Sequence, residues 1–171
     1  FLDGNHVIDL VIVNGSDVNV DSYLNTTTIR ISNYSKLKHS ANGATAEFML
    51  NITGVNITID NSSSINVYGR GYLEGFGPGV GSVTDAGGSY GGTGGVRSLG
   101  VYGSLTTPYD IGSGAQARGN SGGGAIFLNL SGVLRNEGQI NANGTNGGEG
   151  GGSGGGIYVI ANTIDNLGLI T

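Results

Sequence analysis

The chain has 171 residues, a net charge of −5, 36 glycines, two prolines and no cysteine or tryptophan. Its seven lysines and arginines are too few and too scattered for binding to nucleic-acid phosphates, and without cysteine it forms neither disulfides nor thiolate metal sites. No apolar run approaches the roughly 18 residues that a membrane-spanning helix needs. We therefore expect no nucleic-acid partner, no membrane span and no metal or other cofactor.

Residues 1–47 are predicted to form several short strands. The segments "HVIDLVIV" (6–13), "DVNVDSY" (17–23) and "TTIRIS" (27–32) are rich in β-branched residues and alternate in polarity, and "AEFMLNITGVNITID" (46–60) continues the pattern. No window has the 3.6-residue periodicity of a helix, so helix content near zero is expected. We treat residues 1–47 as an N-terminal segment and a candidate donor of a strand to a neighbouring subunit.

Residues 69–124 are mostly glycine, with tyrosine, phenylalanine and leucine at intervals. A flexible linker is typically rich in serine and charge and has no need of regularly placed aromatic residues. We interpret this stretch as a long ordered loop excursion from a body formed by residues 48–171, held against the strands by its aromatic side chains. The alternative is a mobile linker between two subdomains.

Internal repeats follow the excursion. "LNLSGV" (128–133) resembles "LNITGV" (50–55), and "NEGQINANG" (136–144) resembles "NSSSINVYG" (61–69). A third copy aligns with the second through three pairs: Asn136 with Asn166, Gly138 with Gly168 and Ile140 with Ile170. Short recurring strands that turn at Asn and Gly predict an all-β fold of stacked coils, a β-solenoid or parallel β-helix. The alternative is a β-sandwich or jelly roll completed by a neighbour's strand.

Asparagine gives the main indication of cellular location. Eight asparagines begin an Asn-x-Ser/Thr acceptor sequence for N-glycosylation: Asn14, Asn25, Asn33, Asn51, Asn56, Asn61, Asn129 and Asn143. Chance would give about three among the 18 asparagines of the chain. The excess predicts covalent N-linked glycans and an extracellular or cell-surface protein. The alternative is that Asn, Ser and Thr are simply common in turns and on polar strand faces.

Several glycine-rich strings in this order carry a resemblance to a known class: "GRGYLEGFGPGVG", "GGSYGGTGG", "YGSLTTPYDIGSGA", "GGGAIFLNLSGVLRNEGQINANG" and "GGGSGGGIYVIANTI". From about residue 48 to residue 171 they resemble the glycine-rich unit repeated in large secreted surface and adhesin-like proteins. The resemblance implies an extended β-solenoid with a structural or adhesive role and no catalytic residues. The N-terminal strands resemble, in kind only, glycosylated extracellular filament subunits such as archaeal threads.

Candidates for catalysis are few. His6 and His39 lie in polar stretches outside any motif and are expected at the surface. Four glutamates could in principle supply the carboxylate pair of a glycosidase: Glu47, Glu74, Glu137 and Glu149. Because Glu137 and Glu149 lie at glycine corners and no aspartate cluster accompanies them, we expect no enzyme activity.

Two other groups have weak chemical signals. Residues 3–5 ("DGN") and 15–17 ("GSD") offer oxygens to calcium but lack a complete calcium-binding pattern, so we interpret them as turns. The only two lysines, Lys36 and Lys38, suggest an amide crosslink to an Asn or Asp, assisted by Glu47. Ordinary solvated lysines are the favoured interpretation.

The two ends of the chain are apolar, alternating strands without the charge or proline that usually protects a sheet edge. We predict that they pair with other subunits through Val7, Ile8, Leu10, Ile12, Val13, Ile157, Val159, Ile164 and Ile170. The predicted function is a structural subunit of an extracellular glycosylated filament that assembles head to tail with itself by strand pairing. The alternative is an adhesive or carbohydrate-binding surface module, contacting sugar through Tyr90 or Tyr109, within a larger tandem-repeat protein.

Overall fold

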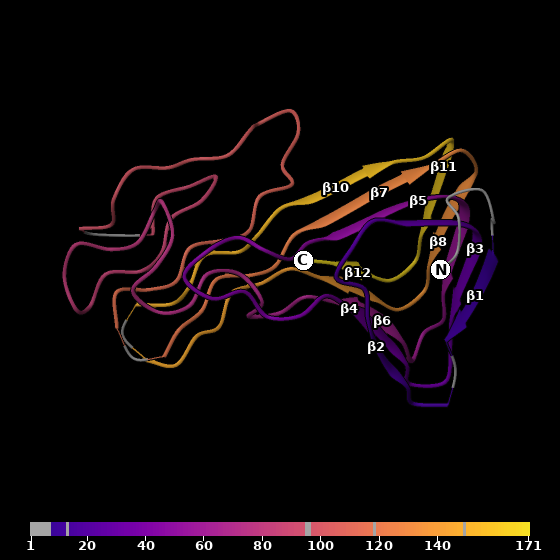
Figure 1. Cartoon of the computed structure of the whole chain (residues 1–171), viewed down its shortest axis with the longest axis horizontal. Helices are drawn as coiled ribbons and strands as arrows, with labels where there is room; N and C mark the ends of the chain where they lie inside the picture. Colours follow the sequence, from indigo (N-terminus) through magenta and orange to yellow (C-terminus); the bar gives the residue numbers. More distant parts are fainter. Residues whose placement is uncertain (1–7, 13, 95–96, 118, 149) are drawn as a thin grey trace.

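The computed structural model of the chain describes residues 8–12, 14–94, 97–117, 119–148 and 150–171 (Figure 1). This part of the chain contains strands and no helix, so the predicted all-β class is confirmed. The strands are β1 (Ile8–Ile12), β2 (Asp17–Asn19), β3 (Leu24–Ile31), β4 (Lys36–Lys38), β5 (Leu50–Ile59), β6 (Ser64–Asn66), β7 (Ile126–Leu130), β8 (Val133–Asn136), β9 (Gln139–Asn141), β10 (Ile157–Ile160), β11 (Thr163–Asn166) and β12 (Leu169–Ile170).

The strands form two parallel sheets. Sheet A has the order β1-β3-β5-β7-β10, with β8 paired to β5 and β11 to β8, and sheet B has the order β12-β9-β6-β4-β2. Parallel strands commonly need long helical crossovers, but here the chain passes from sheet A to sheet B through short turns and then returns to sheet A. Each return therefore lays a new strand beside the previous one.

We call each pass through both sheets a rung. Rung 1 contains β1 and β2, rung 2 contains β3 and β4, rung 3 contains β5 and β6, rung 4 contains β7, β8 and β9, and rung 5 contains β10, β11 and β12. The strands of residues 1–47 continue the same two sheets as the strands that follow, because β3 pairs with β5 and β4 pairs with β6. Both sheets thus extend across the predicted segment boundary.

Parallel register stacks apolar side chains into columns that form the core. Column A lies in sheet A and contains Leu10, Ile29, Ile57, Leu134 and Ile164. Column B lies in sheet B and contains Val18, Leu37, Ile65, Ile140 and Ile170. In rungs 2 to 4 every member of both columns is at most 1% exposed. Burial of each such side chain contributes about 1.5–3 kcal/mol, so the columns hold the rungs together.

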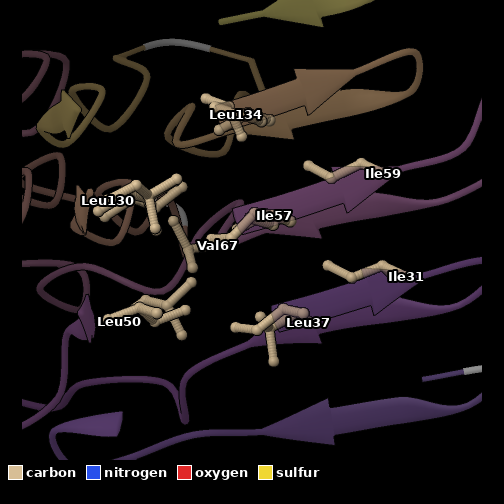
Figure 2. Close-up of a cluster of buried hydrophobic side chains, with 14 of the residues drawn as sticks. Ile31, Leu37, Leu50, Ile57, Ile59, Val67, Leu130 and Leu134 are labelled. Carbon is tan, nitrogen blue, oxygen red and sulfur yellow. The ribbon is translucent and has the colours of Figure 1, made fainter. Parts of the chain in front are cut away.

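The same stacking extends to the rest of the core. Figure 2 shows Ile59 above Ile31 on neighbouring strands, as their pairing in register requires. Ile126 and Leu128 continue the core from Leu50 and Ile52, and all four are fully buried. The core therefore runs along the stacking direction of the rungs.

The sequence repeats coincide with this register in part. Asn136 pairs with Asn166 and Ile140 with Ile170, so the predicted alignment of the third copy is confirmed. The alignment of "LNITGV" with "LNLSGV" is wrong by two residues, because Leu50 pairs with Ile126 and not with Leu128. A shift of two leaves the same side chains facing inward, so hydrophobic alternation does not distinguish the two registers.

The described residues of the glycine-rich segments 69–124 and 142–156 gather on one side of the strands, and we call them the glycine lobe (Figure 1). Their backbones are hydrogen-bonded to one another: the Gly112 amide donates to the Gly123 carbonyl and the Gly123 amide to the Ser153 carbonyl, each at 2.8 Å. A Cβ atom on Gly123 would lie 1.7 Å from the Ala142 carbonyl oxygen. Glycine is needed there because neighbouring backbones touch directly.

Candidate functional site

The strands of rung 5 form an exposed sheet edge. Within the described residues, β10 pairs only with β7, β11 only with β8, and β12 only with β9. An edge strand presents backbone N–H and C=O groups that can pair with another strand. Strand pairing at this edge therefore requires no rearrangement of the sheets.

The rung 5 edge also exposes side chains at core positions. Ile164 in column A is 50% exposed, whereas its partner Leu134 is 0% exposed. Ile170 in column B is 40% exposed, whereas its partner Ile140 is 0% exposed. The other predicted pairing residues of this rung, Ile157 and Val159, are partly buried. A further rung laid on this edge would bury the two isoleucines as completely as their partners.

Additional apolar side chains surround these positions. Ile160, Leu167 and Leu169 are all exposed in the same rung. Together with Ile164 and Ile170 they give this end of the molecule an apolar surface, a feature that typically marks an interaction site. The sequence prediction omitted Ile160, Leu167 and Leu169 because the strand pattern alone did not show which residues the last rung leaves uncovered.

Rung 1 forms the opposite edge. Among the described strands, β1 pairs only with β3 and β2 only with β4. Leu10 and Val18 are partly buried and begin columns A and B, while Ile12 is buried. Ile8 pairs through its backbone with Thr26. The predicted pairing residues Val7 and Val13 lie outside the described residues.

An asparagine pair marks the corner between the sheets in rungs 4 and 5. The buried Asn136 donates from Nδ2 to the Asn166 Oδ1 at 2.7 Å and to the Leu169 carbonyl at 3.4 Å. Asn166 is exposed at the rung 5 edge. The sequence signal for this pair is the recurrence of "NEG" and "NLG", which the repeat alignment placed opposite each other.

The acceptor asparagines fall into two groups by exposure. Six are exposed: Asn14, Asn25, Asn33, Asn61, Asn129 and Asn143. Asn51 and Asn56 are only partly exposed. The Asn56 Oδ1 accepts a hydrogen bond from the Val133 amide at 2.9 Å, and the Asn51 Oδ1 is buried. Glycosylation at all eight stays a prediction, and Asn51 and Asn56 are the least accessible of them.

Three of these asparagines share one corner of successive rungs. Asn14, Asn33 and Asn61 each lie two residues after an isoleucine of one register column, which is formed by Ile12, Ile31 and Ile59. Asn14 and Asn33 have φ angles of 63° and 56°. Asparagine tolerates this left-handed conformation better than most residues. At this corner the asparagines therefore have a turn role as well as an acceptor sequence.

Serines following these asparagines also bond between rungs. The Tyr34 amide donates to the Ser62 Oγ at 3.1 Å, and the Ser35 amide donates to the Ser63 Oγ at 3.2 Å. The hydroxyl required by the acceptor sequence of Asn61 is thus also a structural hydrogen-bond acceptor. The alternative explanation of the Asn, Ser and Thr content, that these residues form turns, has a physical basis at this corner.

The expectation that His39 lies at the surface is wrong. His39 is 0% exposed, its Nδ1 lies 2.7 Å from the Ser40 carbonyl, and the Ala125 amide donates to its Nε2 at 3.3 Å. Burial lowers the pKa of this imidazole below its usual value. The neutral tautomer with a proton on Nδ1 satisfies both contacts, so His39 is a core residue that links rung 2 to rung 4. His6 lies outside the described residues.

The glutamates have separate local partners. Glu47 accepts from the Thr45 hydroxyl at 2.8 Å, Glu74 accepts from the Gly119 amide at 2.5 Å, and Glu137 forms an ion pair with Arg135 at 2.5 Å. Glu149 lies outside the described residues. These contacts involve three different parts of the chain, and none of them joins two glutamates.

The lysine hypothesis and the calcium hypothesis both involve Asp17, the first residue of β2. Lys38 forms an ion pair with Asp17 at 2.5 Å, and hydrogen bonding from Lys38 lowers the pKa of the Asp17 carboxyl. The Glu47 carboxylate is bonded to Thr45. The Asp17 carboxylate is therefore paired with Lys38. For a calcium site, the described residues contain no group of three or more His, Cys, Asp or Glu side chains that could hold a metal ion. Residues 3–5 lie outside the described part.

We compared the chain with protein-family models, with curated proteins and with solved structures. The comparisons gave no match of any of the three kinds. In the described residues no helix is long and apolar enough to cross a membrane.

Proposed function

We propose that the two sheets form a β-solenoid and that the protein is a non-catalytic structural subunit of an extracellular, glycosylated filament. The fold interpretation rests on the strand directions: every pair within the two sheets is parallel. β-Sandwiches and jelly rolls are built mainly from antiparallel strands. Stacked parallel rungs, with no helix among the described residues, favour the solenoid over that alternative.

The observation that carries the assembly proposal is the exposure of core positions at rung 5. Ile164 and Ile170 continue two buried columns but remain 50% and 40% exposed. Each column begins at the opposite edge with an apolar residue, Leu10 or Val18. Rung 5 of one copy laid against rung 1 of the next would continue both columns and pair β11 with β1 and β12 with β2.

The geometry of the edges agrees with such head-to-tail addition. Followed from strand to strand, the register aligns β1 with β11 through β3, β5 and β8. It aligns β2 with β12 through β4, β6 and β9. A second copy would therefore place β1 on β11 and β2 on β12, with all strands parallel. Identical subunits joined through two different edges form open filaments when the contact does not close into a ring.

The glycosylation part of the proposal follows from the few charged residues and the many acceptor asparagines of the chain. Only 11% of the residues are charged, so hydrophilic glycans on the six exposed acceptor asparagines would supply solvation along a long polymer. The presence of glycans and the extracellular location are parts of the same proposal. Both are tested by purifying the native protein and determining its glycan mass.

Assembly is tested on the 171-residue chain by sedimentation velocity at increasing concentration, with electron microscopy of the same samples. We expect oligomers that lengthen with concentration and become filaments. The variant Ile164→Lys/Ile170→Lys places two charges at the edge and should remain monomeric. Val133→Lys is the matched control, because Val133 is also an exposed apolar strand residue but lies in rung 4, away from the edge.

Circular dichroism must show the same strand content in all three proteins. Filaments from the wild-type chain and the control, with monomers from the edge variant, support head-to-tail pairing. If the wild-type chain stays monomeric at every concentration, head-to-tail pairing is contradicted. The exposed edge would then have to be covered by other residues of a longer polypeptide. Equal assembly of the edge variant would place the contact elsewhere.

A further inference from the structure

A cavity of about 320 Å³ lies where the glycine lobe meets the loop that precedes β5. Its volume is at the lower end of the range of small-molecule sites, about 300–1,000 Å³. Its lining residues include four aromatic and two acidic ones: Phe48, Tyr72, Tyr102, Tyr109, Glu47 and Asp110. No lysine, arginine or histidine is among its lining residues.

One wall is a loop held in place by a buried asparagine. The Asn42 Oδ1 accepts from the amides of Glu47 and Phe48, each at 2.7 Å. Its Nδ2 donates to the carbonyls of Phe48 at 2.9 Å and Arg70 at 2.8 Å. Thr45 donates to one Glu47 carboxylate oxygen at 2.8 Å. The loop therefore presents Glu47 and Phe48 to the cavity in a fixed arrangement.

The opposite wall comes from the glycine lobe. The Tyr102 hydroxyl donates to the Ile111 carbonyl at 2.5 Å, and its ring packs edge-on against Tyr90 with centroids 5.1 Å apart. Tyr109 contacts Phe127 of β7, with ring centroids 6.2 Å apart. Tyr102 is thus fixed at both ends, and Tyr109 ties this wall to sheet A.

Three polar groups at the cavity make no hydrogen bond to the described part of the chain. Within the described residues no hydrogen bond is found for the hydroxyls of Tyr72 and Tyr109 or for the Asp110 carboxylate. A ligand that offers hydrogen-bond donors to the carboxylates and apolar surface to the rings would complement these residues. A ligand rich in hydroxyl groups meets both needs, because sugar C–H faces pack on aromatic rings while their hydroxyls donate to carboxylates.

We propose that this cavity binds a neutral saccharide, a hexose or N-acetylhexosamine unit presented singly or as a disaccharide. Two carboxylates without a neighbouring cation disfavour acidic sugars and phosphates. A quaternary ammonium ion would suit the aromatic rings, but it has no donor for the carboxylates and no partner for the two tyrosine hydroxyls. None of the residues that line the cavity belongs to a strand of rung 1 or rung 5, so the proposal does not rest on the proposed filament.

The test is isothermal titration of the 171-residue chain with cellobiose and N,N′-diacetylchitobiose, and with N-acetylneuraminic acid and tetramethylammonium as charged probes. We expect saturable binding of at least one neutral disaccharide and none of the charged probes. Asp110→Asn should weaken that binding about tenfold or more, because a charge-assisted hydrogen bond is lost. Tyr109→Ala should weaken it similarly.

Tyr68→Ala is the matched control, because Tyr68 and Tyr109 are 47% and 46% exposed and only Tyr109 lines the cavity. Binding that is retained by Tyr68→Ala and lost in both cavity variants supports the proposal. The proposal is overturned if neither neutral disaccharide binds, if a charged probe binds instead, or if the cavity variants bind like the wild-type chain. Asp110→Asn preserves side-chain shape, so its result does not depend on a change in packing.

Discussion

Ile164 pairs in parallel register with Leu134, yet Leu134 is fully buried and Ile164 is half exposed. The two side chains occupy equivalent positions of successive rungs and differ only in whether a further rung covers them. The same contrast holds between Ile140 and Ile170. At rung 5, each column therefore ends in a core side chain that no further rung of this chain covers.

Truncation of these two residues should have unequal effects on stability. Leu134→Ala leaves a cavity between rungs 3 and 5 and should lower the free energy of unfolding by about 2–5 kcal/mol. Ile164→Ala removes a side chain with water on one side and should cost about 1 kcal/mol. Urea denaturation of the monomeric protein measures both. Equal costs would mean that Ile164 is covered in solution.

Glycine at position 123 should be irreplaceable. A Cβ atom there would overlap the Ala142 carbonyl oxygen, and the Gly123 amide and carbonyl both take part in hydrogen bonds of the glycine lobe. Gly123→Ala should cost about 3 kcal/mol or more through overpacking. Gly91→Ala is the matched control, because nothing lies within 4 Å of a Cβ atom at that position. Thermal unfolding with an unchanged midpoint for Gly123→Ala would contradict the packing of the lobe.

The buried imidazole of His39 should make stability depend on pH. Burial lowers the pKa of His39 below the usual 6.5, so the unfolded chain binds a proton at a higher pH than the folded chain does. The stabilisation is complete above pH 6.5 and is lost as the pH falls from there through the folded pKa, by up to about 1.4 kcal/mol per pH unit. Urea denaturation at pH 7.5, 6.5 and 5.5 measures the slope.

The His6→Gln background isolates this effect, because it leaves His39 as the only imidazole. Adding His39→Gln should lower stability at pH 7.5 and remove the dependence between pH 7.5 and 5.5. The carboxyls of Asp17 and Asp21 have pKa values lowered by hydrogen bonds from Lys38 and Ser40. They lose their contribution only below about pH 4, outside this window. A slope that survives in the double variant would contradict the role of His39.

Glycan occupancy should follow the exposure of the acceptor asparagines. Peptide mapping of native protein should find the highest occupancy among Asn25, Asn129 and Asn143, which are exposed outside the shared corner. Asn51 and Asn56 should have the lowest occupancy, because their side-chain oxygens are buried or hydrogen-bonded. Full occupancy at Asn56 would contradict the bond from Val133. Absence of glycans at every site would favour the turn interpretation.

The fold class could be predicted from the sequence because the patterns that indicate strands and turns are local. Alternation in residues 24–31 and 50–59 indicates strands with one buried face, and Asn and Gly mark the turns between them. The pairing of Asn136 with Asn166 was predictable because rungs 4 and 5 have nearly equal lengths. Each of these inferences needs only a short stretch of chain.

Other features were set by contacts between distant parts of the chain. The register of Leu50 was wrong because a shift of two residues preserves alternation. His39 looked exposed among polar neighbours, but Ala125, 86 positions away, closes over it. The cavity at Tyr109 depends on how residues 42–49 meet the glycine lobe. No periodicity in the sequence encodes these long-range contacts.

The most direct test of head-to-tail stacking is the axial rise per subunit in filaments of the 171-residue chain, measured by electron cryo-microscopy. Sheet B contains five strands in stacking order, one from each rung, and adjacent strands lie about 4.8 Å apart. Continuous stacking predicts a rise of about 24 Å per subunit, with strands about 4.8 Å apart across the subunit boundary. A rise that is not compatible with five rungs, or a boundary without strand pairing between β1 and β11, would contradict the proposal.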